Sequence, residues 1–119
     1  METPLHFKTI TELAALIKAK ALSPVEVTDA MLTRIQEQDP QYKSYATVIA
    51  EQARASALAA EVAIAAGNYL GSLHGVPIAV KDLCFTKGVA TMGGTKALMG
   101  HVPDFDCTVV QKLNAAGAV

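Results

Sequence analysis

The chain contains 119 residues, 51% of them hydrophobic, and has a formal net charge of −1 with a pI near 6.3. This length and composition suffice for one modest hydrophobic core. The near-neutral charge provides no basic surface for nucleic acid and no cationic face for a membrane. We therefore expect neither of them to be a direct partner of this segment.

The sequence shows no targeting or membrane signal. Met1–Pro4 lacks the basic and apolar regions of a secretory signal peptide. No uninterrupted apolar run is long enough to cross a bilayer. These features predict a soluble, cytoplasmic protein.

The cysteines and histidines do not have the spacing of a metal or redox site. Cys84 and Cys107 stand too far apart for a Cys-x-x-Cys pair, and free cysteines are usually small buried hydrophobic residues. His6, His74 and His101 have no ligand spacing either, which favours surface or hydrogen-bonded histidines. We predict no metal and no cofactor.

Capping signals predict two helices in the first forty residues. Thr9 and Glu12 form a capping box before a helix that extends to about Ala19. Ser23–Glu26 contains a second capping box with proline at the first helical position. Pro40 is expected to lie beyond the end of this second helix.

Two further elements are predicted before Gly71. Tyr45–Val48 is typical of a short strand. The alanine-rich residues 50–66 predict a third helix, with Gly67 as its stop signal.

From Gly71 onward, strand-forming residues and glycines replace the helix-forming residues. Val76, Ile78 and Val80 alternate with smaller or polar residues, which predicts a strand over residues 76–81. A loop and a second extended piece should follow this strand.

The C-terminal residues predict a fourth helix and the start of a strand. Asp106 is a candidate N-cap for a helix through Ala116, and Gly117 stands at its C-terminus. Ala118 and Val119 have the character of a new strand.

Lys81 is the candidate catalytic residue. In a strand it would lie on the face opposite Val76 and Ile78, among small neighbours, where an ammonium is poorly hydrated. Desolvation disfavours the charged form, and a neutral lysine is a proton acceptor. Lowering a lysine pKa by about 3 units from its usual value requires roughly 4 kcal/mol, which burial can supply.

The sequence LHGVPIAVKD at 73–82 resembles the G-V-P-x-A-V-K-D segment that carries the catalytic lysine of the amidase signature family. The resemblance continues through residues 86–95 and 106–119, in the order that the family shows. Members of this family are serine hydrolases with a Ser-cisSer-Lys triad, and they hydrolyse carboxamides to a carboxylate and ammonia. The resemblance implies that Lys81 is the triad lysine.

The resemblance also implies the fold and the extent of the domain. We expect an α/β fold in which helices cover a mixed sheet, preceded by a helical segment. Residues 1–119 would form the N-terminal part of a single amidase domain, with 1–70 mainly helical and 71–119 starting the α/β core.

The two triad serines and the oxyanion donors of the family lie in a later Gly/Ser-rich signature. The serines of this chain stand in no such motif, and Ser23 is better explained as a helix cap. Its serines are Ser23, Ser44, Ser56 and Ser72. The chain alone is therefore expected to be inactive as an amidase.

Residues near Lys81 in the sequence are candidates for shaping its pocket. Met92, Gly93 and Gly94 are expected to line the pocket floor, since glycine lets the backbone approach a ligand closely. A tight turn between strands is the alternative for this segment. Asp82 should point away from Lys81 and brace the loop, because adjacent strand residues face opposite sides.

Within the family, the A subunit of the glutamyl-tRNA amidotransferase is the alternative to a stand-alone amidase. Gly93-Gly94-Thr95 favours the stand-alone amidase. The expected partner is a small-molecule amide substrate. A homodimer, or partner subunits for an amidotransferase, are left open.

Three hypotheses outside the family have weaker support. Gly88, Gly93 and Thr95 match positions of a phosphate-binding loop, but Gly94 stands where that loop requires lysine. A Cys84 nucleophile with His74 or His101 as its base has no supporting spacing. A non-catalytic helical interaction module would use a helical stripe formed by Val27, Met31 and Ile35.

Overall fold

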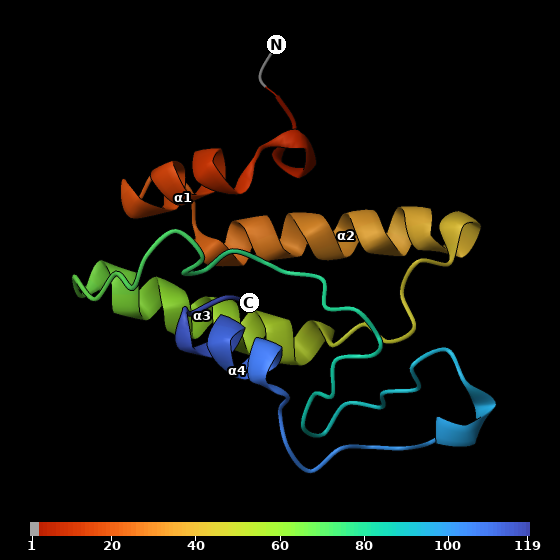
Figure 1. Cartoon of the computed structure of the whole chain (residues 1–119). Coiled ribbons are helices and arrows are strands. Elements are labelled where there is room, and N and C mark those ends of the chain that lie inside the picture. Colours follow the sequence, from red (N-terminus) through yellow and green to blue (C-terminus); the bar gives the residue numbers. More distant parts are fainter. Residues whose placement is uncertain (1–2) are drawn as a thin grey trace.

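The computed structural model describes residues 3–119, so Met1 and Glu2, on which the targeting prediction partly depends, lie outside the described residues. The α-helices are α1 (Ile10–Lys18), α2 (Pro24–Tyr42), α3 (Ala50–Ala65) and α4 (Thr108–Ala115). Figure 1 shows α2 between α1 and α3, with long loops between α3 and α4. None of the helices in residues 3–119 combines the length and apolarity needed to span a membrane.

Both predicted capping boxes are confirmed. The Thr9 hydroxyl accepts a hydrogen bond from the Glu12 backbone N–H, while the Glu12 carboxylate accepts one from the Thr9 N–H at 2.7 Å. Ser23 and Glu26 make the same reciprocal pair at the start of α2, where Pro24 takes the first helical position. These caps satisfy N–H groups that the helix itself leaves without partners.

The predicted position of Pro40 beyond α2 is wrong, because the helix continues to Tyr42. A proline near the end of a helix removes only one of the last backbone hydrogen bonds. Beyond the helix end, the Asp39 carboxylate accepts hydrogen bonds from the Ser44 and Tyr45 backbone N–H groups at 2.6 and 3.2 Å, which fixes the chain where it leaves α2.

The strand predicted at Tyr45–Val48 is also wrong. These residues form an exposed connection between α2 and α3. Strand propensity reflects packing on a pleated, half-buried surface, and no neighbouring segment offers such a surface here.

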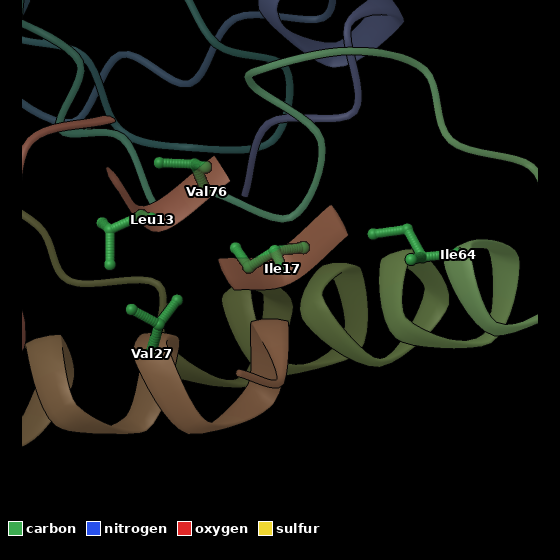
Figure 2. Packing of buried hydrophobic residues seen from close by; sticks show 5 residues of the cluster. All are labelled: Leu13, Ile17, Val27, Ile64 and Val76. Carbon is green, nitrogen blue, oxygen red and sulfur yellow. The ribbon is translucent and has the colours of Figure 1, made fainter. Parts of the chain in front are cut away.

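The hydrophobic core joins the helices to the segment that carries Lys81. Its fully buried members come from α1, α2, α3 and the extended segment after residue 75, and they face one another in Figure 2. These residues are Leu13, Ile17, Val27, Ile64 and Val76. Met31 is partly buried against the same cluster, so Val27 and Met31 of the α2 stripe belong to the core of this chain.

The predicted mixed sheet is not present, since residues 3–119 contain no strand. One parallel contact exists in its place. Val119 donates its N–H to the Val76 carbonyl at 2.9 Å and accepts a hydrogen bond from the Ile78 N–H at 2.8 Å. This is the bonding pattern of parallel strands, but a single residue on one side is too short to form a ladder.

The start of α4 differs by one position from the prediction. Cys107, not Asp106, is the N-cap, and its side chain makes no capping hydrogen bond. The Asp106 carboxylate instead accepts a hydrogen bond from the Lys87 backbone N–H at 2.7 Å. Asp106 therefore ties the loop after Lys81 to the base of α4.

Candidate functional site

Lys81 stands at the end of an extended segment that is anchored in the core. Val76 is only 1% exposed and Ile78 packs against the core cluster, whereas Val80 is 41% exposed. The alternation predicted from the sequence therefore holds for the first part of the segment. The segment therefore begins in the core and ends at the surface, where Lys81 lies.

The Lys81 side chain is exposed in this chain. The expectation that it lies in a dry environment is therefore not met by residues 3–119. The neighbouring small residue Ala79 is exposed as well, so it does not enclose the amine. The backbone is nevertheless held, because the Lys81 carbonyl accepts a hydrogen bond from the Cys84 N–H at 2.9 Å.

Asp82 joins the Lys81 segment to the glycine-containing loop that follows. Its carboxylate accepts a hydrogen bond from the Met92 N–H at 3.1 Å, and its backbone carbonyl accepts one from the Gly93 N–H at 2.8 Å. The prediction that Asp82 braces the loop is confirmed. Both contacts bring Met92 and Gly93 close in space to a residue adjacent to Lys81.

Met92–Thr95 forms a tight turn. The Thr95 N–H donates to the Met92 carbonyl at 3.1 Å, and Gly93 and Gly94 have φ values of +60° and +72°. Two consecutive residues with positive φ at the centre of a turn favour glycine at both positions. The turn leads into a single 3-10 turn at Lys96–Leu98, not into the α-helix that a phosphate-binding loop requires.

The chain on either side of this turn is paired in an antiparallel direction. The Cys107 N–H donates to the Phe85 carbonyl at 2.8 Å, and the Thr91 N–H donates to the His101 carbonyl at 3.0 Å. A third bond of this set joins the N–H of Gly88 to the Pro103 carbonyl at 2.9 Å. Residues 85–107 therefore form a closed loop whose two ends, Phe85 and Cys107, are hydrogen-bonded to each other.

Cys84 has the surroundings of a protonated thiol. Burial raises its pKa, and the neighbouring Cys107 raises it further. A nucleophilic cysteine requires the opposite shift, toward the thiolate. The structure therefore gives no support to a cysteine hydrolase centred on Cys84. The spacing of Cys84 and Cys107 contained no signal that the Cys107 N–H bonds to the carbonyl of Phe85, the residue after Cys84.

The two candidate bases for such a thiol, His74 and His101, make other contacts. His74 is buried, and its Nδ1 accepts a hydrogen bond from the Leu70 N–H at 3.1 Å. Burial lowers the pKa of His74. The His101 ring lies 5.3 Å from the Phe85 ring. The prediction of a hydrogen-bonded histidine is confirmed for His74.

Comparison with known proteins identifies the family. Residues 26–119 match the family described as Amidase. The chain is 52% identical over 110 residues to "Putative amidase AmiD" of Mycobacterium tuberculosis (strain CDC 1551 / Oshkosh), an alignment that covers 92% of this chain and 23% of that protein. It is 46% identical to the A subunit of the glutamyl-tRNA(Gln) amidotransferase of Anaeromyxobacter dehalogenans (strain 2CP-C), with 92% and 22% covered.

Solved structures agree with this relationship. The crystal structure of the peptide amidase PAM in complex with the competitive inhibitor chymostatin matches with a TM-score of 0.90 at 31% identity, covering 98% of this chain and 24% of that one. The chain belongs to the amidase family. It spans about a quarter of the length of the relatives it matches.

Proposed function

We propose that this chain supplies the catalytic lysine, Lys81, of an enzyme that hydrolyses a carboxamide to a carboxylate and ammonia. In this proposal Lys81 accepts a proton from a serine held by a cis peptide bond, and that serine takes one from the nucleophilic serine. The nucleophile then attacks the amide carbonyl and forms an acyl-enzyme. The observation that carries the proposal is the position of Lys81, at the end of a core-anchored segment within the residues that match the family.

The pocket around Lys81 is proposed to include the turn formed by Met92, Gly93 and Gly94. Support comes from Asp82, whose two hydrogen bonds fix the start of this turn beside the Lys81 segment. Glycines with positive φ present bare backbone, which a substrate can approach closely. The same three residues can form a tight turn and also line the pocket.

We further propose that residues 1–119 are the N-terminal part of a single amidase domain. The matched relatives are about four times as long, and several large apolar side chains of this chain remain exposed. Leu83, two residues from Lys81, is 62% exposed, and Leu58 and Val62 of α3 are also exposed. Further domain residues packed on this surface would remove water from Lys81.

Substitution of Lys81 tests the proposed role. In the native polypeptide that contains residues 1–119, Lys81→Ala and Lys81→Arg should both abolish ammonia release from a panel of carboxamides, because a guanidinium does not give up its proton at working pH. Lys87→Ala is the matched control, since Lys87 is exposed in the same loop and only its backbone N–H is engaged. Turnover by Lys81→Arg at the wild-type rate would refute the role of Lys81.

The A subunit of a glutamyl-tRNA amidotransferase is the second candidate, favoured by the 46% identity to such a protein. It would release ammonia from glutamine and depend on charged tRNA and on its partner proteins. A stand-alone amidase would turn over simple amides without them. The two candidates are distinguished by measuring, in the same preparation, ammonia release from glutamine with charged tRNA and partner proteins and the turnover of simple amides without them. A small-molecule amide substrate, a cytoplasmic location and a homodimer remain predictions.

A further inference from the structure

Asp106 attaches the loop that follows Lys81 to helix α4. One oxygen of its carboxylate accepts a hydrogen bond from the Lys87 backbone N–H at 2.7 Å, and the other accepts one from the Asn114 side-chain amide at 3.3 Å. Its backbone carbonyl accepts a hydrogen bond from the Gln111 side-chain amide at 2.7 Å. Because Gln111 and Asn114 both belong to α4, a single half-buried residue joins the loop to the helix through three acceptors.

Two backbone hydrogen bonds continue this connection to Lys81. The Cys107 N–H donates to the Phe85 carbonyl at 2.8 Å, and the Cys84 N–H donates to the Lys81 carbonyl at 2.9 Å. Helix α4 itself is anchored by Val110, which is only 4% exposed. The backbone after Lys81 is therefore held against a packed helix.

We propose that Asp106 is a positioning residue for Lys81, acting through the loop at residues 84–87. The inference rests on the proposed function, because it takes Lys81 as the catalytic lysine. The core holds the chain before Lys81 through Val76 and Ile78, and the bonds of Asp106 hold the chain after it. An ionised acceptor suits this task, since hydrogen bonds to a carboxylate are stronger than those between neutral groups.

The alternative role for Asp106 is that of a helix cap or a favourable charge at the start of α4. A cap would accept from the first N–H groups of the helix, whereas both carboxylate oxygens of Asp106 are bonded to Lys87 and Asn114. The two roles differ in what asparagine can replace. In Asp106→Asn the amide oxygen still accepts from Lys87, and the Asn114 amide can turn to accept from the new amide group.

Steady-state kinetics of the native polypeptide that contains residues 1–119 test the proposal. The probe is whichever of acetamide, benzamide and glutamine the wild type hydrolyses fastest. Asp106→Ala should lower kcat per folded molecule by about ten- to a hundredfold with KM largely unchanged, because a displacement of about 1 Å can cost a hundredfold. Asp106→Asn should restore most of kcat. Asp104→Ala is the matched control, since Asp104 is exposed in the same loop, and it should behave as wild type.

Hydrogen exchange follows the same connection without activity. In Asp106→Ala the Lys87 N–H should exchange about tenfold faster, and the Cys84 N–H, which reports on the Lys81 carbonyl, should also exchange faster. The Ile78 N–H should keep its protection, because its acceptor is the Val119 carbonyl. If Asp106→Ala does not fold, the double variant Gln111→Ala with Asn114→Ala removes the two α4 partners and should lower kcat in the same direction.

Three results would overturn the role of Asp106. These are a wild-type kcat in Asp106→Ala or in the double variant, an Asp106→Asn variant as impaired as Asp106→Ala, and unchanged exchange at Cys84. If Lys81→Ala is inactive, any of them refutes the positioning role alone. An active Lys81→Ala variant would instead refute the proposed function and, with it, this inference.

Discussion

The imidazole ring of His74 lies directly against the bare α-carbon of Gly117. Gly117 ends α4 with a φ of +77°, and its carbonyl accepts a hydrogen bond from the Gly75 N–H at 2.9 Å. This contact leaves no room for a side chain at position 117. It connects the end of α4 to the segment that leads to Lys81.

Replacing Gly117 with alanine should destabilise the protein by about 2–5 kcal/mol. The new Cβ would collide with the His74 ring, and alanine would also have to adopt a left-handed conformation. Gly88→Ala is the matched control, because its φ of +75° is similar but no atom lies within 4 Å of the added Cβ. It should cost only about 1–2 kcal/mol. Urea unfolding measures both, and equal losses would show that the His74 contact is unimportant.

Stability should decrease as the pH falls below the ordinary histidine pKa of about 6.5. Burial lowers the pKa of folded His74, so the unfolded chain takes up a proton at a higher pH than the folded chain. The His74 contribution is therefore fully present above the unfolded pKa and is lost as the pH falls toward the folded pKa. His74→Asn should remove this part of the pH dependence, as measured by urea unfolding at several pH values.

His101→Asn is the control for that experiment, since His101 is exposed. This variant should retain the wild-type pH profile. If His74→Asn leaves the pH profile of stability unchanged and His101→Asn flattens it, the pH dependence does not come from His74 and the prediction is wrong.

Truncating the centre of the core should be costly. Ile17 is 1% exposed in the cluster of Figure 2, so Ile17→Ala should lower the free energy of unfolding by about 2–5 kcal/mol. Leu58→Ala removes a similar side chain that is 54% exposed in residues 3–119 and that the proposed domain packing would cover. A loss comparable to that of Ile17→Ala, measured by thermal or urea unfolding of the native polypeptide, would support that packing, whereas a change of about 0.5 kcal/mol or less would contradict it.

Asp82→Ala should loosen one defined hydrogen bond of the turn beside Lys81. The Met92 N–H would lose its carboxylate acceptor, and its hydrogen exchange should become about tenfold faster. The Gly93 N–H serves as an internal control, because its acceptor is the Asp82 backbone carbonyl. Asp82→Asn should preserve protection of Met92, since the amide oxygen can still accept. Unchanged exchange at Met92 in Asp82→Ala would show that the carboxylate does not hold the turn.

Much of the helical half of the molecule was predictable from local signals. The capping boxes of α1 and α2 involve groups three residues apart, so their geometry follows from the sequence without knowledge of the rest of the fold. The burial of Val76 and Ile78 likewise follows from their alternation with smaller residues.

The errors arose where a distant partner decides the outcome. The Tyr45–Val48 segment has strand-forming residues but no neighbouring strand, and Val119 provides only one residue of parallel pairing to the segment after Gly75. The hydrogen bond between the Cys107 N–H and the Phe85 carbonyl depends on an irregular antiparallel closure that no spacing rule describes. Pro40 was misplaced because a proline this close to the helix end removes a single hydrogen bond, and the helix continues to Tyr42.

The order of the residues was enough to specify the helices, the buried face of the Lys81 segment and the resemblance to the amidases, because these depend on neighbours along the chain. Folding added that Asp82 holds the glycine turn, that His74 packs on Gly117 and that Lys81 is exposed. These features depend on which distant segments meet. Burial and hydrogen bonding across a loop are properties of the folded arrangement, and no short stretch of residues specifies them alone.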